Sequence, residues 1–164
     1  MKNALIVIDV QKFFAVEKAK DIPLKVAEHI EQSKYDYVLF TKFRNDPNSN
    51  FHKLLNWKLA TKSPEIDIHP ILVPFVNNEN LFEKTTYSAF KSKEFVNFLR
   101  TKKIDEIYLC GINLDGCVLA TAYEAFDLGF KVEILEELCS VSSSKKEYED
   151  SAKVIIRRNL RPKI

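Results

Sequence analysis

The feature that most constrains the fold is a series of short apolar runs rich in β-branched residues. Residues 4–8 form the first run, Ala-Leu-Ile-Val-Ile, with no polar residue in it. A strand with one face in water alternates apolar and polar side chains, so this run predicts a strand covered on both faces, as in a parallel sheet. Comparable runs occupy residues 37–41, 81–83, 107–110 and 132–135.

Segments with helical periodicity separate these runs. They are predicted at residues 21–34, at 93–102, from Cys117 onward and at 145–159, with Asp21 and Ser92 as N-caps. The apolar residues expected to face inward on the last two helices are Val118, Ala122, Ala125 and Phe126, then Tyr148, Ala152, Ile155 and Ile156. The alternation predicts an α/β fold, a doubly wound, mainly parallel sheet of about six strands with helices on both faces, in a single domain over residues 1–164.

Composition narrows the class of protein. The 164 residues are 46% hydrophobic and 29% charged, which is typical of an ordinary globular chain. Three cysteines without a CxxC pair indicate neither a disulfide framework nor a zinc ribbon, and favour a reducing, cytoplasmic setting. A formal net charge of +2 gives no basis for nucleic-acid binding. No apolar stretch has the length of a membrane span, and the N-terminal apolar run is too short for a signal peptide.

The pattern of residues 104–129 predicts a strand, a polar turn and a helix, with Cys117 at the start of the helix. The first turn of a helix has unpaired backbone N–H groups and the positive end of the helix dipole, which favour a thiolate. Cys117 is therefore a candidate nucleophile. The alternative is that it is a small core residue, because free cysteine is often buried.

Two further polar residues follow predicted strands. Asp9 comes directly after residues 4–8, and Lys84 directly after residues 81–83. The carboxyl ends of parallel strands meet at one edge of a sheet, so we expect Asp9, Lys84 and Cys117 to share a site there. The carboxylate would take the thiol proton, and the ammonium would lower the pKa of the thiol. Each residue taken alone also has an alternative role: Asp9 could cap a helix or turn, and Lys84 could be an ordinary surface lysine.

Residues 42–80 are irregular, with a turn at residues 46–50, a possible short helix at 51–57, and prolines at positions 64, 70 and 74. Such a segment often forms a binding loop or lid. Aromatic residues expected at a pocket wall are Phe43, Phe51, Trp57 and Phe75 from this segment, with Phe13, Phe14 and Tyr87 from elsewhere. We single out Phe14, Trp57 and Tyr87 as substrate-binding residues. Arg44 would pair either with a substrate carboxylate or with a surface acid.

Three blocks of sequence, residues 4–11, 83–90 and 111–118, together resemble the signature blocks of the isochorismatase-like cysteine hydrolases, the group that includes nicotinamidases and N-carbamoylsarcosine amidases. The resemblance implies that Cys117 is the nucleophile, Asp9 the general base and Lys84 the supporting cation. It also implies an oxyanion hole formed by the backbone amides of Asn113 and Cys117, aimed by a cis peptide between Ile112 and Asn113. Members of the family are often homo-oligomers.

Two departures from the family refine the expected chemistry. Nicotinamidases carry an Asp-x-His metal motif where this chain has Phe43-Arg44-Asn45, and His52 and His69 do not replace it. Isochorismatases proper lack the cysteine. The sequence therefore predicts an enzyme without metal or cofactor, which cleaves a C–N bond of a small amide or carbamoyl compound through a thioester. The alternatives are a non-enzymatic oligomeric or ligand-binding member of the fold, and a redox-sensing thiol protein.

Overall fold

The computed structural model describes residues 2–161 and contains one parallel sheet of five strands in the order β3-β2-β1-β4-β5. The strands are β1 (Lys2–Ile8), β2 (Tyr37–Phe43), β3 (Leu81–Lys84), β4 (Ile104–Ile112) and β5 (Lys131–Ser140). All adjacent pairs are parallel. The α/β fold with a parallel sheet is thus confirmed, but the described residues supply five strands where about six were expected.

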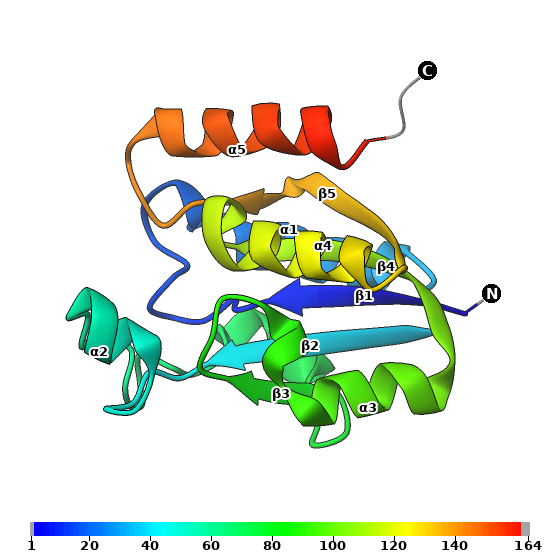
Figure 1. Ribbon diagram of the computed structural model, residues 1–164, viewed down its shortest axis with the longest axis horizontal. Coiled ribbons are helices and arrows are strands. Elements are labelled where there is room, and N and C mark those ends of the chain that lie inside the picture. The colour runs from blue at the N-terminus through cyan, green and yellow to red at the C-terminus, as the bar shows by residue number, and fades with distance from the viewer. Residues whose placement is uncertain (1, 162–164) are drawn as a thin grey trace.

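β1 is the central strand, as its composition predicts. Ala4 to Ile8 are all at most 1% exposed, because β2 and β4 flank the strand and helices cover both faces. The strand arrowheads in Figure 1 point to one edge of the sheet, so the residues that follow β1, β3 and β4 lie near that edge.

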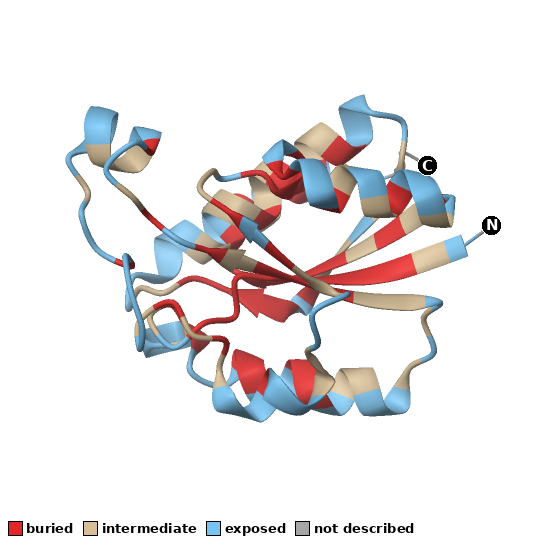
Figure 2. Cartoon of the chain, turned by 90° about the horizontal axis from the view of Figure 1, so that it is seen from below, coloured by how far each residue is buried: buried red, intermediate tan, exposed pale blue. Residues whose placement is uncertain are grey.

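The helices lie on both faces of the sheet (Figure 2). They are α1 (Ile22–Gln32), α2 (Asn50–Leu55), α3 (Lys93–Lys102), α4 (Leu119–Asp127) and α5 (Lys146–Asn159). Three short 3₁₀ turns, Glu17–Ala19, Pro70–Phe75 and Ala89–Lys91, join them to the strands, and a π turn, Leu114–Val118, precedes α4. α2 projects beyond the edge where the strands end (Figure 1). No helix among residues 2–161 is both long and apolar enough to cross a membrane.

The predicted inward faces of two helices need correction. On α4, Ala122 and Ala125 are buried, but Phe126 is 58% exposed. On α5, Ala152 and Ile156 are buried, whereas Tyr148 and Ile155 are exposed. Helical periodicity predicts which apolar side chains share one face of a helix. How many of them become buried depends on how far the neighbouring elements extend over that face. α2 also ends at Leu55, before the expected Trp57, because Asn56 turns into the left-handed region with φ of 51°.

Gly111 allows β4 to approach the central strand β1 closely. It pairs with Ile8 and has φ of +124°, a backbone conformation that favours glycine. A Cβ atom placed on Gly111 would lie only 2.2 Å from the backbone oxygen of Ile8. The glycine therefore lets the segment after β4 pass beside the residue that precedes Asp9.

We predict that Gly111→Ala lowers the free energy of unfolding by about 3 kcal/mol or more, because it adds backbone strain and a clash with β1. Gly129 is the matched control, since its φ is also positive, at +85°, but nothing lies within 4 Å of an added Cβ. Gly129→Ala should cost about 1 kcal/mol. Urea denaturation measures both changes, and equal losses would contradict the role given to Gly111.

Candidate active site

Asp9 lies directly after β1 in an unusual backbone conformation, with φ of 49°. Its side chain is fixed by Thr41 of β2, whose Oγ1 donates a hydrogen bond to Asp9 Oδ1 at 2.7 Å and accepts one from the Asp9 amide at 3.1 Å. Asp9 is 1% exposed. A non-glycine residue held in the left-handed region is a frequent feature of functional sites.

Lys84, the last residue of β3, pairs with Asp9 across β2. Its Nζ lies 2.6 Å from Asp9 Oδ2, and both side chains are 1% exposed. Lys84 Nζ also donates to the carbonyl oxygen of Thr86 at 2.8 Å and lies 5.2 Å from the ring centroid of Phe43. Burial by itself lowers the pKa of Lys84, but Asp9 and Cys117 outweigh that effect and the pKa is raised. The lysine is therefore a stable cation within the protein.

Cys117 lies in the π turn between β4 and α4. Its Sγ is 3.5 Å from Lys84 Nζ, so the structure brings together Asp9, Lys84 and Cys117. The turn is held by the Asn113 carbonyl oxygen, which accepts hydrogen bonds from the amides of Gly116 and Val118, each at 3.1 Å. The Ile112–Asn113 peptide is cis, as the resemblance implied.

The protonation state of the thiol differs from the one expected. Desolvation raises the pKa of Cys117 to about 12. Lys84 lowers this pKa, but the Asp9 carboxylate opposes the effect of Lys84, so the effect of desolvation prevails. The lysine and the helix start favour a thiolate, as the sequence predicts, but the loss of water around the sulfur outweighs them. In the free protein the thiol is therefore neutral beside an ion pair, and a thiolate forms only when a base takes its proton.

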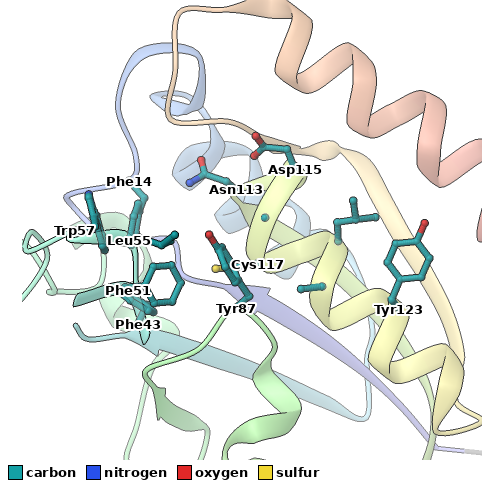
Figure 3. Close-up of a pocket in the computed structure, with 13 residues that line it drawn as sticks. Phe14, Phe43, Phe51, Leu55, Trp57, Tyr87, Asn113, Asp115, Cys117 and Tyr123 are labelled. Carbon is teal, nitrogen blue, oxygen red and sulfur yellow. The ribbon is translucent and has the colours of Figure 1, made fainter. Parts of the chain in front are cut away.

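A cavity of about 700 Å³ opens beside Cys117 (Figure 3). The predicted substrate-binding residues Phe14, Trp57 and Tyr87 all line it. The other lining residues are Phe43, Phe51, Leu55, Asn113, Asp115, Gly116, Leu119, Ala120 and Tyr123. Phe51 packs against Tyr87 with ring centroids 4.6 Å apart and against Trp57 at 5.8 Å. The cavity therefore suits a small, largely apolar or planar molecule.

Some predicted pocket residues do not reach this cavity. Phe13 and Phe75 are absent from its lining. Arg44 also lies outside it, and its Nε is 3.6 Å from a carboxylate oxygen of Glu83. Of the two roles considered for Arg44, the structure shows the pairing with a surface acid, Glu83.

Sequence reasoning missed residues that hold the cavity wall in place. Asn45 is 1% exposed, and its Nδ2 donates to the carbonyl oxygens of Trp57 at 2.8 Å and of Leu59 at 3.1 Å. Its Oδ1 accepts a hydrogen bond from Ser49 Oγ. These bonds close the loop that carries Phe51 and Trp57. The signal in the sequence was only an asparagine before a turn, which does not identify its distant partners.

Comparison with known proteins identifies the family. Residues 3–159 match the isochorismatase domain, so the chain belongs to the isochorismatase-like hydrolase family. The nicotinamidase/pyrazinamidase of Mycobacterium tuberculosis is 28% identical over 159 residues, which cover 83% of this chain and 85% of that protein. The suspected family is therefore confirmed.

Solved structures agree with this assignment. The crystal structure of nicotinamidase PncA from Bacillus subtilis has a TM-score of 0.80 at 28% identity and covers 98% of this chain and 97% of its own. The crystal structure of N-carbamoylsarcosine amidase from Thermoplasma acidophilum shares the fold, with a TM-score of 0.78 at 20% identity and coverage of 94% and 92%.

The segment of this chain at the place of the nicotinamidase metal motif does not fit a metal ion. Phe43 provides an aromatic ring, Arg44 is a cation, and the Asn45 side chain is committed to the loop. Among residues 2–161 no three His, Cys, Asp or Glu side chains are grouped as metal ligands. His52 and His69 do not line the cavity. A divalent cation needs several oxygen, nitrogen or sulfur ligands, which this donor set lacks.

We predict that Lys84→Met lowers the free energy of unfolding by about 3–5 kcal/mol, because it leaves the Asp9 carboxylate buried without its partner. Lys91 is the control, since it pairs with Glu124 but its side chain is 61% exposed. Lys91→Met should change stability by less than about 1 kcal/mol. Chemical denaturation followed by circular dichroism measures both, and a loss below about 1 kcal/mol for Lys84→Met would contradict a buried charge pair.

Proposed function

We propose that the protein is a metal-independent cysteine hydrolase that cleaves a C–N bond of a small amide or carbamoyl compound. The observation that carries the proposal is the buried constellation at the cavity: Lys84 Nζ lies 2.6 Å from Asp9 Oδ2 and 3.5 Å from Cys117 Sγ. Lys84 thus contacts both Asp9 and Cys117, and a base, a cation and a thiol grouped in this way are what nucleophilic acyl transfer requires.

The first half of the reaction forms a thioester. Asp9 takes the proton from Cys117 as the sulfur attacks the carbonyl carbon, and the carbonyl electron pair moves to its oxygen. The backbone N–H groups of Asn113 and Cys117 bind this oxyanion. The C–N bond then breaks, and the nitrogen leaves as ammonia or an amine with the proton held by Asp9. Lys84 keeps its charge throughout and stabilises Asp9 whenever the carboxylate is ionised.

The second half releases the acyl group. The Asp9 carboxylate takes a proton from a water molecule as that water attacks the thioester carbon. The carbon–sulfur bond breaks, and Cys117 recovers the proton from Asp9. The products are a carboxylic or carbamic acid and the free enzyme. The raised pKa of Cys117 supports this scheme, because a neutral thiol needs a base at the moment of attack.

The relatives support the reaction class. One is named a nicotinamidase/pyrazinamidase and another an N-carbamoylsarcosine amidase. We extend amide or carbamoyl hydrolysis from them to this chain because the constellation of Asp9, Lys84 and Cys117 is complete. The aromatic cavity is consistent with a small substrate.

We predict that the protein releases ammonia or an amine from a panel of small amides and carbamoyl compounds, and that Cys117→Ala lowers kcat/KM at least about a thousandfold with the fold retained. Cys139→Ala is the control, because Cys139 is buried and does not line the cavity. It should leave turnover largely intact. Ammonia release and circular dichroism are the measurements.

Three outcomes would redirect the interpretation. Full activity in Cys117→Ala would contradict a cysteine nucleophile. Binding of panel compounds without turnover by the unaltered protein would favour a ligand-binding member of the family. A reversible disulfide at Cys117 under mild peroxide would favour the redox-sensing alternative, although both other cysteines, Cys110 and Cys139, are buried.

A further inference from the structure

The cavity extends to both sides of the proposed nucleophile. On one side of Cys117 its wall is aromatic, and on the other side it follows α4 as far as Tyr123 (Figure 3). The aromatic wall consists of Phe14, Phe43, Phe51 and Trp57. Pockets of about 300–1,000 Å³ hold drug-sized ligands, so a cavity of about 700 Å³ has room for more than a single ring with a primary amide.

The side of the cavity that follows α4 is an apolar groove. Leu119, Ala120 and Tyr123 line this α4 groove, and each of them is partly exposed. Four residues of α-helix rise about 6 Å, so the groove extends over about that length from Leu119 to Tyr123. The hydroxyl of Tyr123 accepts a hydrogen bond from Asn159 Nδ2 of α5 at 2.8 Å, which holds the far wall of the groove in place.

The two sides of the cavity meet at the turn that carries Cys117, opposite Tyr87. A Cβ atom added to Gly116 would lie 3.6 Å from the Tyr87 ring, so this ring faces the turn. The same ring packs on Phe51 of the aromatic wall, with centroids 4.6 Å apart. A carbonyl carbon within reach of Cys117 Sγ therefore lies where the aromatic side joins the α4 groove, in the middle of the cavity and not at one end of it.

This central position constrains the substrate, because an amide carbonyl carbon has two substituents besides its oxygen, the acyl group and the nitrogen. An acyl group on a primary amide fills only one side of the cavity. We propose that the substrate is an N-substituted amide with an apolar group on each side of the cleaved bond, one against the aromatic wall and one in the α4 groove. This inference rests on the proposed amide hydrolysis.

The leaving group is then an amine and not ammonia. As the C–N bond breaks, Asp9 gives the nitrogen the proton that it took from Cys117, and the amine leaves along the side of the cavity that held its substituent. Water then hydrolyses the thioester, so that one amide and one water molecule yield one carboxylic acid and one amine.

The α4 groove could instead be ordinary open surface, because partly exposed apolar side chains are common on folded proteins. The two cases have different signatures. On open surface, an apolar chain on the amide nitrogen stays in water and adds no affinity. In a substrate groove the same chain leaves water and strengthens binding, and it does so more than an equal chain on the acyl group.

The experiment uses benzamide and two isomers that each add a butyl chain to it, N-butylbenzamide and 4-butylbenzamide. The isomers contain the same atoms and differ only in which side of the amide bears the chain. Each probe is titrated by calorimetry into the Cys117→Ala protein, so that affinity is measured without turnover. We expect N-butylbenzamide to bind at least about tenfold tighter than benzamide and at least about threefold tighter than 4-butylbenzamide, because its chain is buried in the α4 groove.

Variants of α4 test whether the groove is the cause of this preference. Adding Ala120→Leu should fill the groove and reduce the preference for N-butylbenzamide over benzamide toward one. Tyr123→Ala should reduce the same preference, because it removes the far wall. Asp127→Leu is the matched control, since it enlarges an exposed residue of the same helix that does not line the cavity, and it should leave the preference unchanged.

An affinity for N-butylbenzamide no higher than that for benzamide or 4-butylbenzamide, an unchanged preference in both Ala120→Leu and Tyr123→Ala, or no binding of any probe would overturn the proposal. Release of butylamine or ammonia by the unaltered protein tests the proposed function separately. A preference for N-butylbenzamide without hydrolysis of any probe contradicts the hydrolase and leaves the α4 groove its role. Hydrolysis of benzamide and 4-butylbenzamide without that preference contradicts the role of the groove and leaves the hydrolase.

Discussion

The buried ion pair between Asp9 and Lys84 is the interaction on which the site depends. It joins the ends of β1 and β3 across the intervening β2, whose Thr41 holds the other carboxylate oxygen of Asp9. Two charges without access to water are costly unless they are paired and hydrogen-bonded. The sheet supplies that pairing because parallel strands end at one edge, and Gly111 lets β4 bring the Cys117 turn beside it.

The same pair sets the chemistry of the thiol. An isolated lysine beside a cysteine favours the thiolate, but Asp9 neutralises much of that effect, and burial leaves the pKa of Cys117 at about 12. The thiol of the free protein is therefore neutral, and in the proposed mechanism Asp9 takes its proton as the sulfur attacks a bound substrate. The cavity wall is built separately, by a loop that Asn45 closes through backbone carbonyls.

Much of this arrangement was predictable from sequence because it follows from topology. The uninterrupted run before Asp9 predicts a central parallel strand, and parallel strands bring Asp9, Lys84 and Cys117 to one edge. The exposure of Phe126 and the number of strands were not predictable, since they depend on which elements cover which faces. The bonds of Asn45 depend on the path of a loop, and the thiol pKa depends on packing around the sulfur. Neither is encoded in local periodicity.

The pH dependence of Cys117 alkylation by iodoacetamide, compared between the unaltered protein and Asp9→Asn, tests the central claim most directly. Cys117→Ala provides the background from the two buried cysteines. The unaltered protein should show a rate that rises without a plateau below about pH 10, and Asp9→Asn should shift the midpoint downward because Lys84 then acts on the thiol unopposed. A plateau near neutral pH in the unaltered protein, or an upward shift in the variant, would contradict a neutral thiol governed by the ion pair.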